Sequence, residues 1–247
     1  MQPKFDLNKI KFVTDQPTFE KAVNLYENGK VSDFQEKFDG FSARVLGGNF
    51  YQVSISSKNF SQGSCDCYLG QNDYICKHMV AVAIHAVLGG KPIKKEDKEV
   101  FYEPKCSNRP GELSKIELAK TQKSISGAMK YIKSYNGPSR IWFAYQDSLI
   151  EGCNRLSAIV SELPVSRQTA DLLVKMLLRL DKKLCNGGVD DSDGTVGGFM
   201  EELVNVLQEF SRIDHGCTAA FKVLKNQETS FGWEEPLLKL AYGIINV

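Results

Sequence analysis

The chain has 247 residues, of which 42% are apolar and 25% charged, as expected of a folded protein rather than a fibrous or disordered one. Its 31 basic residues balance 30 acidic ones, so total charge gives no argument for nucleic acid binding. The longest apolar run, residues 79–88, is about half the ~20 residues of a membrane span. We therefore expect no membrane association. The first residues lack the apolar stretch of a secretory signal, which favours a cytoplasmic protein.

The N-terminal part mixes helix and strand patterns. Residues 17–29 predict a short helix that opens at proline and ends at glycine. Three short runs follow at 31–38, 41–45 and 51–55, and the last two alternate apolar and polar residues, as half-buried strands do. Residues 47–49, Gly-Gly-Asn, supply a hairpin turn between them. This part of the sequence predicts a small antiparallel meander.

The strongest motif is a cluster of cysteines and one histidine. Of seven cysteines, three lie within twelve residues, and a histidine follows two residues after the third. Clustered cysteines without a signal peptide more often bind metal than form disulfides. Three thiolates and one imidazole suit Zn²⁺, and four protein ligands leave no open position for water, so the site would be structural. The predicted ligands are Cys65, Cys67, Cys76 and His78.

The spacing C-x-C-x8-C-x-H, after a β-hairpin and before an Ala/Val-rich helix, resembles the SWIM-type zinc finger. The resemblance covers roughly residues 38–88. It implies that Cys65, Cys67, Cys76 and His78 are the four zinc ligands, and that the finger binds DNA or protein. Such fingers occur in helicases of the chromatin-remodeller type, in mutator-like transposases and in stand-alone bacterial proteins. The chain is most similar to the stand-alone form, in which a helical region follows the finger.

The C-terminal part is helical in pattern. Residues 89–112 are rich in proline and charge, with little periodicity, and predict a linker. Beyond it, apolar stripes predict helices over about 113–136, 139–163, 166–184, 199–210, 218–224 and 236–245. The fold class is therefore α+β: a small antiparallel β zinc-binding domain followed by an all-α bundle or short α-solenoid. The predicted domains are 1–88, a SWIM-like finger, and 113–247, all-α.

Two other motifs are better explained by structure than by chemistry. Residues 188–194 resemble a calcium loop, but an EF-hand alignment places Val189 and Met200 where acidic ligands are needed, so its aspartates are expected to cap a helix. Asp214, His215 and Cys217 are too close in sequence for a catalytic triad, which is built from distant segments. We expect no catalytic residues, no small-molecule substrate and no enzymatic activity.

Positive charge is concentrated after the linker. Between residues 115 and 140 there are six basic residues and one acid, and Lys120, Lys123 and Lys130 are predicted to share one helical face. This face could contact phosphates or could be an ordinary solvated surface. The finger itself is neutral, so DNA contacts would need these lysines, or others just beyond the finger at Lys91, Lys94 and Lys95.

Aromatic residues follow the basic segment. Trp142, Phe143 and Tyr145 could stack on bases, although helical core is the better interpretation. The leading hypothesis is a non-catalytic zinc protein that binds DNA or a protein partner. The alternatives are a protein-interaction scaffold without nucleic acid binding and an accessory subunit of a DNA-processing enzyme.

Overall fold

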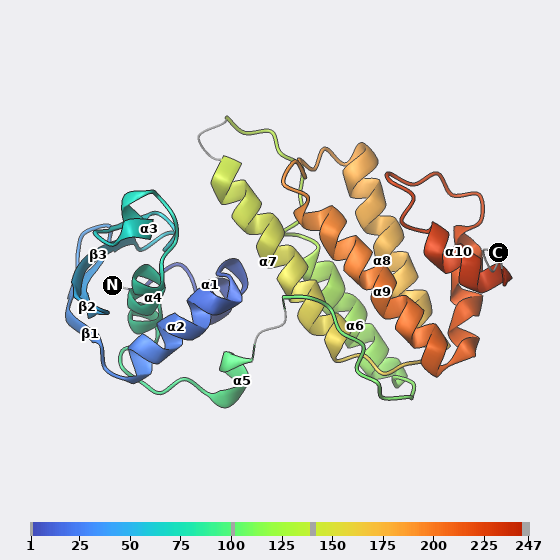
Figure 1. The fold of residues 1–247 in the computed structure, drawn as a ribbon, viewed down its shortest axis with the longest axis horizontal. Coiled ribbons are helices and arrows are strands. Elements are labelled where there is room, and N and C mark those ends of the chain that lie inside the picture. The colour runs from blue at the N-terminus through green and yellow to red at the C-terminus, as the bar shows by residue number, and fades with distance from the viewer. Residues whose placement is uncertain (1, 100–101, 139–141, 244–247) are drawn as a thin grey trace. The chain divides into compact units, whose positions relative to one another are not determined.

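The computed structural model describes residues 2–99, 102–138 and 142–243, apart from the side chain of Phe143. The chain divides into two compact units, Met1–Val100 and Phe101–Val247 (Figure 1). We call them the zinc unit and the helical unit. Among the described residues, no helix is long and apolar enough to cross a membrane.

The zinc unit combines a four-stranded antiparallel sheet with helices. The strands lie in the order β1-β2-β3-β4, the β2–β3 pair being the hairpin predicted around residues 47–49. The elements are α1 (Leu7–Val13), α2 (Gln16–Glu27), β1 (Val31–Glu36), β2 (Gly40–Leu46), β3 (Phe50–Ser56), β4 (Gly63–Cys65), α3 (Tyr68–Gln71), α4 (Lys77–Leu88) and α5 (Lys95–Lys98).

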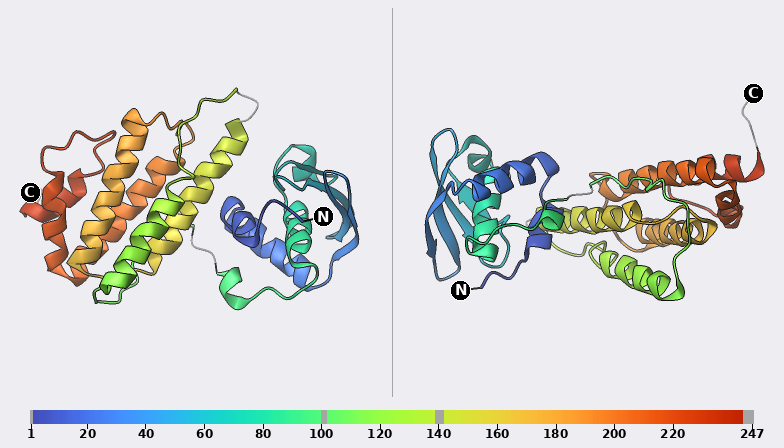
Figure 2. Two further views of the ribbon diagram at one scale, coloured as in Figure 1. Left: turned by 180° about the vertical axis from the view of Figure 1, so that it is seen from behind. Right: turned by 90° about the horizontal axis from the view of Figure 1, so that it is seen from below.

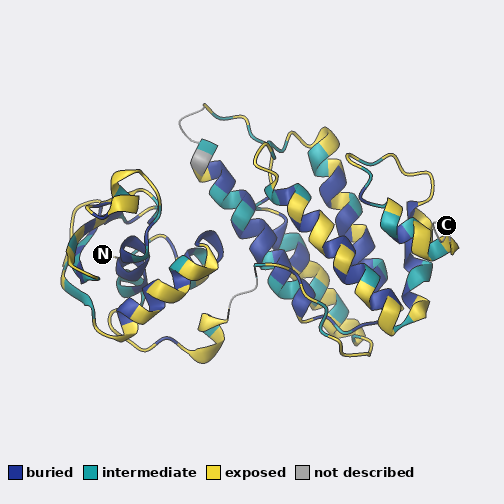
Figure 3. Ribbon diagram, viewed as in Figure 1, coloured by how far each residue is buried: buried dark blue, intermediate teal, exposed yellow. Residues whose placement is uncertain are grey.

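Helix α4 forms the centre of this unit. It packs against β2 and β3 on one side and α2 on another, and residues 78–84 are all buried (Figures 2 and 3). A helix surrounded in this way needs apolar residues on every face, which explains its Ala/Val-rich sequence. Gly89 ends it in a left-handed conformation (φ 57°), donating its N–H to the His85 carbonyl. The core that α4 organises is where the metal ligands meet.

The segment predicted as a linker is packed at both ends. The Tyr26 hydroxyl donates to the Lys91 carbonyl, and Ile93 is buried in the core of the zinc unit. On the other side, Ser107 donates its hydroxyl proton to the Leu163 carbonyl, and Gly111 donates its N–H to Val165. The sequence signal for a linker, proline and charge without periodicity, therefore describes irregular backbone that still has partners.

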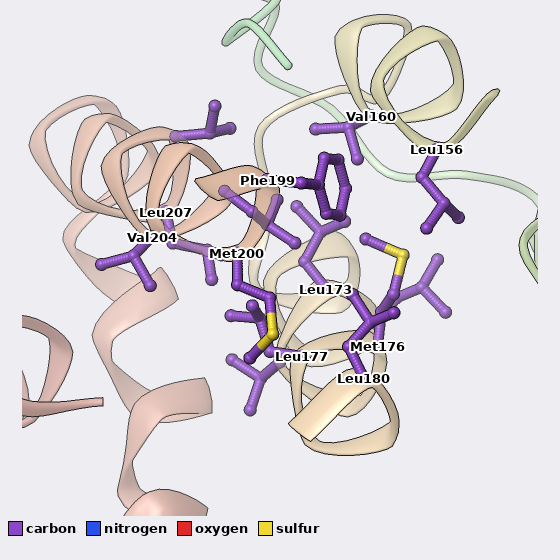
Figure 4. Close-up of a cluster of buried hydrophobic side chains, with 14 of the residues drawn as sticks. Leu156, Val160, Leu173, Met176, Leu177, Leu180, Phe199, Met200, Val204 and Leu207 are labelled. Carbon is purple, nitrogen blue, oxygen red and sulfur yellow. The ribbon is translucent and has the colours of Figure 1, made fainter. Parts of the chain in front are cut away.

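The helical unit contains α6 (Lys115–Ala128), α7 (Trp142–Ser161), α8 (Arg167–Asn186), α9 (Thr195–Ile213), η2 (His215–Leu224) and α10 (Glu235–Tyr242). Helix α7 packs against α6 and α9, α8 packs against α9, and η2 packs against α8, α9 and α10. Their buried side chains form one continuous core, part of which is shown in Figure 4. A shared core of this kind is that of a bundle rather than a solenoid.

Two helix predictions differ from the structure. Helix α6 ends at Ala128, not near residue 136, although Ile132 is still fully buried in the turn that follows. The apolar spacing thus continued past the helix, because a buried turn needs apolar residues too. The segment near 218–224 is a 3₁₀ helix, η2, and the predicted start of α7 at residues 139–141 lies outside the described residues.

Candidate metal centre

The four predicted ligands come from three short elements that follow one another in the chain. Cys65 ends strand β4, Cys67 is the N-cap of α3, Cys76 is the N-cap of α4, and His78 lies in the first turn of α4. Cys65 pairs with Val53, whose side chain is buried on the sheet face that α4 covers. Because directly opposed residues of an antiparallel pair point to the same face, this register directs Cys65 toward α4.

The ligand atoms are close enough to share one ion. The three sulfurs and the histidine nitrogen all lie within 4.8 Å of one another, and all four residues are buried. The Nδ1 atom of His78 is 3.7 Å from the Cys65 Sγ and 3.9 Å from the Cys76 Sγ. Tetrahedral zinc, with Zn–S near 2.3 Å and Zn–N near 2.0 Å, places such atoms about 3.6 Å apart. The donor set and its spacing therefore fit a closed structural zinc site held through Nδ1.

Backbone N–H groups favour the thiolate form of the cysteines. The N–H of Cys67 opposes part of the rise in the pKa of Cys65, and the N–H of Met79 contributes to the lowered pKa of Cys76. The N–H of Gly70 donates to the Cys67 Sγ over 3.4 Å. Such bonds stabilise thiolate over thiol, as outer-shell partners of a metal site do.

Gly70 is needed for close approach. A Cβ at this position would lie 2.5 Å from both the carbonyl oxygen and the Cβ of Cys65. Only glycine therefore lets the α3 turn fold back far enough for its N–H to reach the Cys67 sulfur. The sequence alone does not reveal this contact, because it depends on how α3 folds back on β4.

The thiols differ in acidity without metal. The hydrogen bond from the Cys65 thiol lowers the pKa of Cys76, with further contributions from His78 and the Met79 N–H. The same bond raises the pKa of Cys65. The first thiolate thus forms on Cys76, at the positively polarised N-terminal end of α4. Cys65 would have to lose its proton to serve as a zinc ligand, so metal binding would weaken as pH falls.

The imidazole of His78 is fixed by two residues of the β2–β3 hairpin. Its ring stacks on Tyr51 with centroids 4.3 Å apart. A Cβ at Gly47 would lie 2.8 Å from the Nε2 atom and 3.0 Å from the Tyr51 ring, so the absence of a side chain makes room for the ligand. The Nε2 atom is buried without a hydrogen-bond partner among the described residues. Packing, not a second hydrogen bond, therefore orients this ligand.

We expect Gly47→Ala to weaken zinc binding about tenfold, the lower end of what supporting residues of metal sites contribute. The added methyl would displace the imidazole or the Tyr51 ring. A competition titration with a chromophoric zinc chelator measures the effect. Gly48→Ala is the matched control, because a Cβ there meets nothing within 4 Å. Equal affinities in the two variants would contradict the packing role of Gly47.

The aspartates of the calcium-like segment 188–194 have structural roles. Asp191 accepts the N–H groups of Val196 and Gly197 in the first turn of α9, as a capping residue does. Asp190 accepts from the Trp142 indole over 2.9 Å.

The other residues that the sequence singled out also have local partners. Asp214 accepts from the Gly216 N–H at the start of η2, where Cys217 is buried. Tyr145 is buried and its hydroxyl donates to the Lys133 carbonyl, so it belongs to the core. The side chain of Phe143 lies outside the described residues.

Comparison with known proteins gives a local match at the metal centre. Residues 51–87 match the family model of the SWIM zinc finger. The matched range begins at Tyr51, which stacks on His78, and includes all four ligands. No match was found among curated proteins or among solved structures. The match and the buried Cys₃His cluster together show that this chain contains a zinc-binding SWIM finger.

Proposed function

We propose that this protein binds DNA and is not an enzyme, and that its zinc ion has a structural role. The observation that supports a structural, non-enzymatic zinc ion is the closed donor set: four buried protein ligands leave zinc no position for a substrate or a reactive water. Free thiols at such a site need a reducing compartment, which supports a cytoplasmic location.

DNA is supported as the partner by the distribution of charge outside the finger. Residues 51–87 contain two lysines and two aspartates and are therefore neutral. Lys91, Lys94 and Lys95 follow α4 and are exposed, and Lys120, Lys123 and Lys130 are exposed in the helical unit. This distribution fits a protein in which the metal stabilises the neutral finger. The exposed lysines outside the finger would then neutralise the DNA phosphates.

We expect the zinc-loaded protein to bind a short duplex with a steep salt dependence. If at least four phosphates are contacted, log K should fall with log salt with a slope near −3.6 or steeper. Fluorescence anisotropy between about 50 and 200 mM salt measures this slope. Absence of binding to any duplex at the lowest salt would contradict DNA as the partner.

A second candidate is a protein partner, and one observation favours it. Tyr68 and Leu69 in α3, and Tyr74 after it, lie between the second and third ligands and are 82%, 44% and 66% exposed. Exposed aromatic residues are typical contact residues of protein interfaces. If the wild-type protein fails to bind DNA, a pull-down compared with a Tyr68→Ser/Tyr74→Ser variant tests this alternative, which predicts loss of a specific partner in the variant.

A further inference from the structure

Two segments far apart in the sequence meet in the helical unit. The Arg179 guanidinium of α8 donates to the Ser126 hydroxyl of α6 over 3.5 Å. The Lys183 Nζ, one turn further along α8, donates to the Ile132 carbonyl over 2.6 Å, just past the end of α6. These contacts place the C-terminal half of α6 and the turn after it beside α8.

This contact changes which basic residues lie together. Lys123 lies three residues before Ser126 on α6, and so lies beside the residue that Arg179 contacts. Lys130 lies in the turn after α6, two residues before Ile132, whose carbonyl accepts from Lys183. Lys120 instead lines a groove between α6 and α7, which also contains Glu117 and Glu162. The face predicted from spacing, with Lys120, Lys123 and Lys130 together, therefore does not form, because α6 ends at Ala128 and Lys120 faces α7.

Helix α8 adds three exposed cations to this side. Lys175, Arg179 and Lys182 lie at spacings of four and three residues, which places them on one helical face. The opposite face of α8 is buried in the bundle core through residues such as Leu173 and Leu177. We call the joint surface the basic face; its members are Lys123, Lys130, Lys175, Arg179 and Lys182, all exposed.

The acidic residues on these helices do not neutralise the basic face. Glu117 accepts the Ser114 N–H in the capping box of α6. Asp181 is buried and accepts from Ser230 and from the Trp233 indole. Asp171 is half-buried and lies four residues before Lys175 on α8, so it is the carboxylate of these two helices that lies nearest to the basic face. Within the described part of the chain, none of the five cations makes an ion pair within 4 Å. Burial lowers the pKa of Lys183, and the positive charge of the neighbouring Arg179 lowers it further.

We propose that the basic face is the surface on which this protein binds the phosphate backbone of duplex DNA. The inference rests on the proposed function and assigns the binding to the helical unit rather than to the finger. Successive cations on α8 are separated by about 4.5–6 Å of helical rise, a spacing that can meet a strand carrying one charge per 3.4 Å. A membrane surface fits less well, because among the described residues of α6 and α8 the exposed large apolar side chain is a single one, Ile116, at the end of α6 away from Ser126.

The test is charge reversal on α8 with a matched control in the zinc unit. The variant is Lys175→Glu/Arg179→Glu/Lys182→Glu. The control is Lys21→Glu/Lys37→Glu/Lys58→Glu, which makes the same charge change at three exposed lysines. Both full-length, zinc-loaded proteins are titrated with a fluorescent duplex over a salt series, and folding is checked by circular dichroism.

The expected result is at least a tenfold loss of affinity in the α8 variant and a salt slope shallower by about 2.7, for three lost phosphate contacts. The control should lose far less and keep its slope. Equal losses in both variants would show a nonspecific charge effect and overturn the assignment. Wild-type binding that the α8 variant retains would overturn the basic face while leaving DNA binding in place.

No salt-sensitive binding by the wild type would instead remove the proposed function itself. Binding to vesicles of anionic lipid, with none to DNA, would overturn the assignment in favour of a membrane. If the α8 variant does not fold, Lys175→Gln/Lys182→Gln, which removes two charges and leaves Arg179 on Ser126, replaces it with an expected slope change of about 1.8.

Discussion

Cys76→Ser should release zinc and unfold the zinc unit. The serine hydroxyl does not ionise at neutral pH and cannot replace the Cys76 thiolate at the N-cap of α4, whose pKa the Cys65 thiol lowers. Structural zinc sites supply about 10–16 kcal/mol of apparent binding free energy, as much as the whole free energy of unfolding of a typical domain, about 5–15 kcal/mol. Elemental analysis and the NMR dispersion of residues 1–100 measure the two effects.

Cys185→Ser is the matched control for this variant. Cys185 is an exposed cysteine of α8, far in sequence from the ligands, and its replacement should leave zinc content and folding unchanged. Full zinc retention by the Cys76 variant would contradict the ligand assignment.

Removing zinc with a strong chelator under reducing conditions should unfold only one of the two units. The helical unit has its own core, which contains no metal ligand, and its first helix begins with a complete Ser114–Glu117 capping box. We therefore expect the far-ultraviolet helical signal of residues 101–247 to persist while the signals of residues 1–100 collapse.

An isolated fragment from about residue 102 to 247 is the control for chelation. Its melting temperature should not depend on zinc or chelator. Cooperative loss of all helical signal from the full chain on chelation would contradict independent folding of the two units.

Much of the zinc unit could be predicted from local sequence. The hairpin followed from alternation and from glycines at residues 47–48, and the ligand set followed from the spacing of three cysteines and a histidine. Both signals are local, because the ligands come from a segment of fourteen residues. Strand β4 was missed, because Gly-Ser-Cys carries no strand propensity and pairs only through the register of Val53 with Cys65.

The residues that hold the imidazole of His78 in place could not be identified from the sequence. Gly47 and Tyr51 belong to the hairpin that precedes the ligand segment in the sequence. Their contact with His78 depends on how this hairpin packs over α4. A glycine that provides space has the same sequence signal as a glycine that forms a turn. Here Gly47 does both, and only the three-dimensional contact separates the two roles.

In the helical unit, the sequence likewise could not show which basic residues lie together. Helical spacing placed Lys120, Lys123 and Lys130 on one face, but it could not show that α6 ends at Ala128 or that Arg179 lies beside Ser126. The cap of α8 is local, because Ser166 accepts the N–H of Thr169 three residues away. The position of α8 beside α6 depends on tertiary packing, and the basic face depends on that position.

X-ray absorption at the zinc edge tests the closed structural zinc site most directly. We expect one zinc per chain with three sulfur neighbours near 2.3 Å and one nitrogen near 2.0 Å, and no oxygen ligand. A first shell that contains a water oxygen, or fewer than three sulfurs in the fully reduced protein, would contradict it.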